Sequence, residues 1–177
     1  MTDKLTIALN AVEMSYSDLV QIAEDSLSPV LQPAKKLVRE ELDRNINSLP
    51  IDLIRDYMWQ LQVQSFNLSE IKEKAAFKAD LATALQKEAY AIKFNSIDGS
   101  AAVKEKQALV LISEEILTDT LYGLCANLLK TTLDEVHRSI DTLKSILMSR
   151  MQETKFMNMG TSSEIPSTTN GRITLNE

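Results

Sequence analysis

The stretch from residue 101 to about residue 157 limits the possible folds of this chain more than any other segment does. It contains no proline and a single glycine, Gly123, and its apolar residues recur at helical spacing almost throughout. A helix of about 57 residues is on the order of 85 Å long, at about 1.5 Å per residue. A compact single-core domain of 177 residues cannot hide such a rod. We therefore expect other parts of the chain to lie along it.

The second half of this stretch carries a heptad seam, in which apolar residues are spaced alternately by four and by three. The seam residues are Leu129, Leu133, Val136, Ile140, Leu143 and Leu147. Sustained seams of this kind contact another helix. Two partners are open: the other helices of the same chain, or a second copy. Because the helical arm before the turn is shorter than the rod, we favour self-association, and the seam predicts a homo-oligomer.

The segment before the rod predicts a second long helix and a tight turn. Residues 68–94 are rich in alanine, which has the highest helix propensity and allows another helix to approach closely. Residues 95–100 have turn chemistry, in which Gly99 can adopt positive φ, and Ser100 is placed to cap the rod. A short turn between two long helices makes them antiparallel neighbours. The sequence thus predicts a long helical hairpin.

The N-terminal third predicts shorter helices separated by prolines. The segment from Ser26 to Pro33 holds two prolines and is expected to interrupt any helix there, after which a helix runs from Pro33 to Asn47. A break at residues 48–50 precedes a helix of about 16 residues, and Asn67 with Glu70 suggests the start of the next one, with a break or a kink between them.

These elements together predict an all-α fold. Residues 1–158 form a single helical domain, in which N-terminal helices occupy 1–49 and the long antiparallel hairpin occupies 50–158. Residues 159–177 are dominated by Gly, Pro, Ser, Thr and Asn, which predicts a flexible, disordered tail.

Composition excludes several functional classes. The net charge of −6 opposes general attraction to nucleic acid or to acidic membranes. A single cysteine, Cys125, cannot form an intramolecular disulfide. No signal peptide is evident at the N-terminus, and no apolar run approaches the 18 residues or so of a membrane span. We expect a soluble, cytoplasmic protein without a membrane partner.

Catalytic patterns are largely missing from the sequence. His137 shares a helix face with Asp134 and Asp141, which resembles a metal site, but one imidazole among carboxylates is more typical of a solvated charged face. Cys125 has no histidine near it in sequence and is expected to be a buried small apolar residue. We therefore predict no enzyme activity, no catalytic residue, no metal and no cofactor.

Lysines concentrate around the predicted turn. Residues 68–106 hold seven lysines against six acids, whereas the rest of the chain is acidic. The candidate nucleic-acid-binding residues are Lys74, Lys78, Lys87, Lys93, Lys104 and Lys106. Together with Tyr90 and Phe94 they fit a single-stranded nucleic acid surface, with cations for phosphates and rings for stacked bases. The alternative is a set of ordinary solvated lysines paired with glutamates, with both rings in the core.

Several short motifs between residues 68 and 150 resemble a known family. The segment Lys74-Ala75-Ala76-Phe77-Lys78-Ala79-Asp80-Leu81 is similar to a basic K-x-A-Φ-K-A-x-L pattern, where Φ is apolar. Segments 104–106, 119–123 and 143–145 follow in comparable order and spacing. In these respects the chain resembles the UvsY-like phage recombination mediators.

This resemblance implies a function that the residues alone do not. It implies a non-enzymatic oligomeric accessory protein of DNA recombination, which binds single-stranded DNA and helps to load a recombinase onto DNA coated by a single-stranded-DNA-binding protein. Lys78 falls on a basic DNA-contacting position of the family. The location implied is the host cytoplasm, if the chain is phage-encoded. The alternative is a helical structural or adaptor protein, such as a phage assembly or regulatory factor, that binds only proteins.

Overall fold

The computed structural model describes residues 16–42 and 46–160, and these residues form helices without any strand. The predicted all-α class is therefore confirmed for them. The elements, in chain order, are α2 (Tyr16–Lys35), a π-helical segment (Lys36–Glu41), a 3-10 turn (Ile46–Ser48), α3 (Ile51–Ser96), α4 (Ala101–Leu111) and α5 (Ser113–Gly160).

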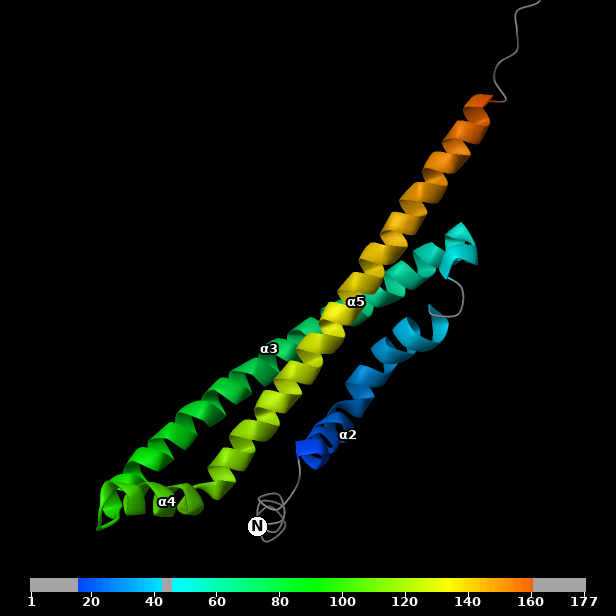
Figure 1. The fold of residues 1–177 in the computed structure, drawn as a ribbon. Helices are drawn as coiled ribbons and strands as arrows, with labels where there is room; N and C mark the ends of the chain where they lie inside the picture. The colour runs from blue at the N-terminus through cyan, green and yellow to red at the C-terminus, as the bar shows by residue number, and fades with distance from the viewer. Residues whose placement is uncertain (1–15, 43–45, 161–177) are drawn as a thin grey trace, which may run out of the picture.

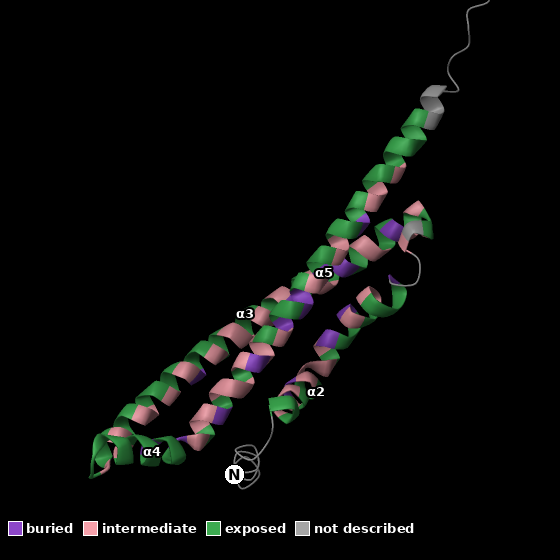
Figure 2. Cartoon of the chain, viewed as in Figure 1, coloured by how far each residue is buried: buried purple, intermediate pink, exposed green. Residues whose placement is uncertain are grey.

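Three helices make an elongated bundle (Figure 1). α3 and α5 pack along each other in opposite directions, and α2 packs mainly on α5. The α5 segment farthest from α4 extends beyond both other helices, and its surface is mostly exposed (Figure 2). α4 lies across the opposite end of the molecule and joins α3 to α5.

One continuous core lies where the three helices meet. α5 contributes Leu129, Val136 and Leu143, each wholly buried, and they pack against residues of the two other helices. The other core residues are Leu31 and Ala34 of α2, Leu42 just after the π-helical segment, and Ile54, Leu61 and Leu68 of α3. A buried Leu or Ile contributes about 1.5–3 kcal/mol through removal of its side chain from water, so this cluster holds the bundle together.

The heptad seam therefore lies inside the chain. Leu129, Leu133, Val136 and Leu143 are buried, and Ile140 and Leu147 pack partly buried against the same cluster. We had favoured a seam that faces a second subunit. In the structure, α2 and α3 of the same chain cover the seam instead. The alternative that was left open, packing within the chain, is what the structure shows.

The predicted single rod is in fact two helices. α4 ends at Leu111, and α5 begins at Ser113. At the bend Ile112 has φ −110° and ψ 22°, yet its N–H still donates to the Ala108 carbonyl at 3.1 Å. Ala108 and Ile112 are both fully buried at the bend, so packing fixes a bend that no Pro or Gly marks. Ser113 with acidic Glu114 is the local start signal that sequence reasoning passed over.

Two further helix boundaries differ from expectation. α2 continues through Pro29 and Pro33, where an interruption was predicted. Both prolines are exposed, whereas Ala23 and Leu31 on the other side of α2 are buried, so packing offsets the lost backbone hydrogen bonds. α3 runs unbroken past Asn67, where a new helix start was suggested.

The turn before α4 is as predicted, because Gly99 has φ +135°. Ser100 precedes α4 and its carbonyl accepts from the N–H groups of Val103 and Lys104, at 3.0 and 2.9 Å. The predicted tail begins later than expected, since α5 extends to Gly160. Residues 161–177 and 1–15 lie outside the described residues.

The buried position of the seam predicts unequal effects of two truncations on α5. Leu129→Ala is expected to lower the free energy of unfolding by about 2–5 kcal/mol, because it removes fully buried methyl groups. Met148→Ala, at a side chain that is 54% exposed, is expected to change it by about 0.5 kcal/mol or less. Urea unfolding measures the free energy of unfolding of both variants. Equally small decreases in the two variants would contradict the described core.

Gly99 and Gly123 predict stability changes of opposite sign. Gly99→Ala is expected to destabilise by about 1 kcal/mol, because an L side chain at this positive φ is strained. Gly123→Ala is expected to stabilise by about 0.5–1 kcal/mol, since Gly123 is inside α5 and a Cβ there meets no atom within 4 Å. Urea unfolding of both variants measures these changes. If both variants shift the free energy of unfolding in the same direction, the prediction is wrong.

Candidate functional site

The predicted lysines lie on the C-terminal half of α3 and on α4. Successive residues on a helix turn by about 100°, so Lys74, Lys78 and Lys93 lie within an arc of about 100° on one flank of α3. Lys87 lies about 180° from Lys78, on the other side. The structure thus brings three of the six lysines together along one flank.

Several of these lysines already have partners within the chain. Lys74 Nζ donates to the Glu70 carboxylate at 2.5 Å, and this bond holds the pKa of Glu70 below its usual value. Lys78 Nζ lies 5.9 Å from the centre of the Tyr122 ring on α5. Lys106 borders a surface pocket formed with Val110 and Leu111.

The two rings expected to stack on bases instead stack on each other. Tyr90 and Phe94 are half-buried, with ring centres 5.7 Å apart. Lys104 Nζ lies 6.0 Å from the Phe94 ring, and so joins α4 to α3. Contacts of these kinds are worth on the order of 0.5–1.5 kcal/mol each. This cluster supports the turn and leaves little ring surface for a ligand.

The most unusual surface of the molecule is the outer side of α3. Seven large apolar side chains there expose between 41% and 75% of their surface. We call them the outer stripe, and they are Trp59, Val63, Phe66, Phe77, Leu81, Leu85 and Ile92. Their spacing keeps all seven within an arc of about 100°, on the side of α3 opposite the core residues.

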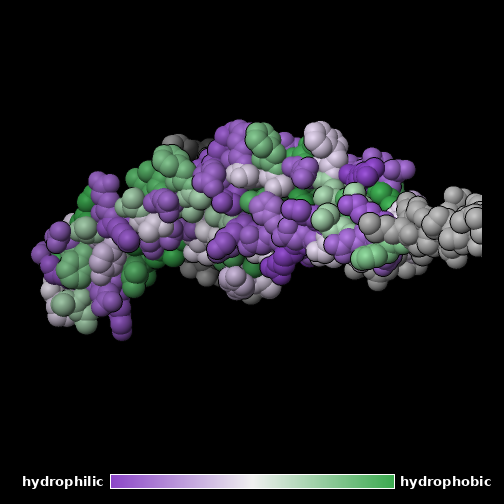
Figure 3. All heavy atoms as spheres, turned by 90° about the horizontal axis from the view of Figure 1, so that it is seen from above, coloured by the Kyte–Doolittle hydropathy of each residue, from purple (hydrophilic) through white to green (hydrophobic). Residues whose placement is uncertain are grey.

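Sequence reasoning missed this stripe, although its signal was present. The apolar residues of α3 were taken only as signs of helix, with no face assigned to them. They in fact fall on two opposite faces, since Ile54, Leu61 and Leu68 are fully buried while Phe66 and Phe77 are 75% and 70% exposed. A helix with two apolar faces needs cover on both sides. Figure 3 shows hydrophobic side chains among hydrophilic ones over the end of the molecule formed by α3 and α4.

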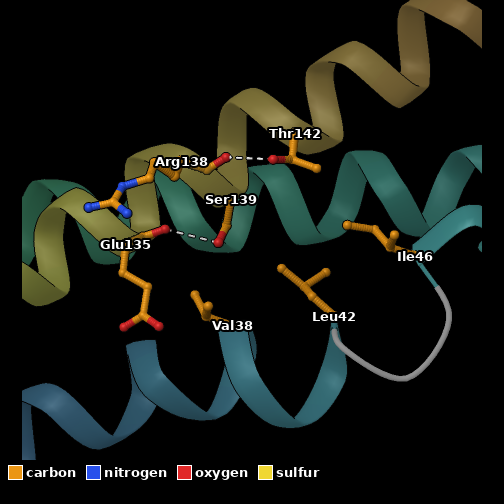
Figure 4. Close-up of a pocket in the computed structure, with 7 residues that line it drawn as sticks. All are labelled: Val38, Leu42, Ile46, Glu135, Arg138, Ser139 and Thr142. Carbon is orange, nitrogen blue, oxygen red and sulfur yellow. Dashed lines mark hydrogen bonds between the residues drawn. The ribbon is translucent and has the colours of Figure 1, made fainter.

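A pocket of about 310 Å³ lies between α5 and the π-helical segment (Figure 4). Val38, Leu42 and Ile46 line one side and polar residues of α5 line the other. The Ser139 hydroxyl donates to the Glu135 carbonyl at 2.9 Å, and the Thr142 hydroxyl donates in the same way to the Arg138 carbonyl. These hydroxyls thus donate to carbonyls of their own helix, and the Glu135 carboxylate among the lining residues pairs with Arg39 at 3.4 Å.

The residues considered for metal binding and reactivity serve other contacts. His137 Nε2 lies 2.7 Å from the Ser65 hydroxyl, which links α5 to α3. No group of three or more His, Cys, Asp or Glu side chains suited to a metal ion occurs in the described part of the chain. Cys125 is half-buried, and burial raises the pKa of its thiol, which keeps the thiol protonated at neutral pH.

Comparisons of the chain with protein-family models, with curated proteins and with solved structures found no match. The resemblance to recombination mediators therefore stays a prediction. Within the described residues, no helix is both long enough and apolar enough to span a membrane.

Proposed function

We propose that this protein is a non-enzymatic helical adaptor or scaffold, and that the outer stripe of α3 is its protein-binding surface. The single observation that carries the proposal is the exposure of the stripe. Monomeric soluble proteins rarely expose contiguous apolar patches larger than about 300–600 Å². Aromatic residues are also enriched at protein interfaces, and Trp59, Phe66 and Phe77 are each at least 68% exposed.

The charge of the stripe also fits a protein partner better than a polyanion. Glu70 and Glu73 interrupt the apolar residues between Phe66 and Phe77, and Glu88 lies between Leu85 and Ile92. The whole chain carries −6. Phosphates approaching this face meet carboxylates as well as Lys74, whereas a protein surface can pair with both signs.

Site-specific photocross-linking in cells tests this proposal. A photoreactive phenylalanine analogue at Phe77 is expected to form adducts with protein chains, since this side chain is 70% exposed within the outer stripe. The same analogue at Phe156 is the matched control, because Phe156 is 74% exposed but lies on α5, outside the stripe. Mass spectrometry identifies the adducts, and equal protein adducts at both positions would contradict the proposal.

A second candidate function is the binding of single-stranded DNA in recombination, as the family resemblance implies. One observation favours it: exposed Phe77 lies three residues from Lys74, which places a ring and a cation on the same face. Lys78 and Lys93 extend the cations along one flank of α3. Such a surface combines base stacking with phosphate contacts. The recombinase and the single-stranded-DNA-binding protein would then be the further partners.

Salt-dependent binding separates the two candidates. If single-stranded DNA binds along this flank, changing Lys74 and Lys78 together to Gln should reduce the slope of log affinity against log salt by about 1.4. Changing Lys130 and Lys144 on α5 to Gln should leave that slope unchanged. Fluorescence anisotropy of a labelled oligonucleotide measures both. Undetectable binding by the full chain at low salt would remove the DNA candidate.

A further inference from the structure

The sequence of the outer stripe is almost symmetric about residue 72. Val63 and Leu81 each lie nine residues from that position, and Trp59 and Leu85 each lie thirteen residues from it. Phe66 lies six residues before it and Phe77 lies five residues after it. An antiparallel pair of identical helices places the residue n positions before the centre opposite the residue n positions after it. Two outer stripes that cross at residue 72 would therefore place Val63 against Leu81 and Trp59 against Leu85, and would bring Phe66 and Phe77 to within one residue of facing each other.

The charges at the centre of the stripe follow the same symmetry. Glu70 and Lys74 lie two positions before and two positions after residue 72, and both are exposed. In an antiparallel pair Glu70 faces Lys74 of the second copy, and the contact occurs twice. In a parallel pair in register Glu70 would face Glu70 and Lys74 would face Lys74, which like charges disfavour. The charges therefore select the antiparallel arrangement.

The exposed area of the stripe is close to the lower limit for a specific interface. From residue 59 to residue 85 it runs for about 39 Å of helix. Its three rings, which are 68–75% exposed, present on the order of 400 Å² per copy, at about 200 Å² per aromatic side chain. Two copies, with their aliphatic members, approach the roughly 1,200 Å² that a specific interface buries in total.

The contact also has defined ends. Sixteen positions from the centre, Asp56 would face Glu88 of the second copy, and these like charges oppose any closer approach there. The symmetric segment is thus limited to residues 59–85. This segment lies opposite the core face of α3, so that pairing through it needs no change in the bundle.

We infer that two copies of this chain associate through their outer stripes, antiparallel about a two-fold axis at residue 72. The inference rests on the proposed function, because it names a second copy as the partner of the same protein-binding face. The pair is isologous, as in most protein dimers.

Cysteine cross-linking of the full chain tests the register. In a Cys125→Ser background, one chain carries Val63→Cys and another carries Leu81→Cys. After mixing and mild oxidation, we expect a disulfide-linked dimer that contains one chain of each kind. Either variant alone should give none, because the two copies of the same position lie on the order of 27 Å apart along the helices, and a disulfide needs Cα atoms within about 7 Å.

A neighbouring cysteine provides the matched control. In the control, Gln62→Cys is used in place of Val63→Cys, because Gln62 is exposed but faces about 100° away from Val63. Mixed with the Leu81→Cys chain, it should give at most a tenth of the disulfide-linked dimer that Val63→Cys gives. If a variant does not fold by circular dichroism, Trp59→Cys with Leu85→Cys tests the same register. A disulfide between two Val63→Cys chains would overturn the antiparallel pairing, and equal yields with the control would overturn the pairing altogether.

Failure of the inference and failure of the proposed function give different results. If no mixed dimer forms, the cysteine of the Val63→Cys chain is treated with a water-soluble maleimide and compared with that of the Gln62→Cys chain. Equal rates mean that the stripe is free, which overturns pairing with a second copy and leaves another protein as the partner. A rate at least tenfold lower in a monomer means that the chain covers its own stripe, which overturns both proposals.

Discussion

The contact between α3 and α5 uses one face of each helix, and the rest of the structure depends on what this contact leaves uncovered. On α5 the remaining part of the seam is covered by α2, so that Leu129, Val136 and Leu143 are fully buried. On α3 nothing in the described part of the chain covers the opposite face. Phe66 and Phe77 are therefore exposed although their neighbours Leu61 and Leu68 are buried. The proposal of a partner for α3 rests on this difference.

The candidate nucleic-acid-binding lysines and rings make contacts within the chain. These lysines fit phosphate contacts by type, but three of them contact a glutamate or an aromatic ring of the chain itself. Tyr90 and Phe94 stack on each other in the same way. Two lysines that a sequence pattern assigns to a ligand, Lys78 and Lys104, are thus used here to join α3 to α5 and to α4. The apolar stripe has no such use within the described chain.

Local patterns in the sequence were sufficient for the class of fold and for the turn at Gly99, because helix propensity and positive φ are properties of single segments. They were not sufficient where distant packing decides. Burial of Ala108 and Ile112 bends the predicted rod, and packing of Ala23 and Leu31 carries α2 through two exposed prolines. The seam was interpreted as an assembly surface because the helical arm before the turn was expected to be too short to cover the rod, and packing of α2 on α5 was not foreseen. The outer stripe was missed because two apolar faces of one helix look like a single apolar helix.

The central claim is that α3 has two apolar faces, of which the inner one folds the chain and the outer one joins it to a second copy. Sedimentation equilibrium of the full chain tests it most directly, with Phe66 and Phe77 both changed to Glu in one sample and Phe156→Glu in another. The unmodified chain and Phe156→Glu should have twice the 19.8 kDa mass of one chain. The doubly substituted chain should have a single-chain mass with unchanged helical content. Its dissociation constant for self-association should rise by a factor of about 30 or more. A single-chain mass for the unmodified protein at high concentration, or a dimer that survives both substitutions, would contradict it.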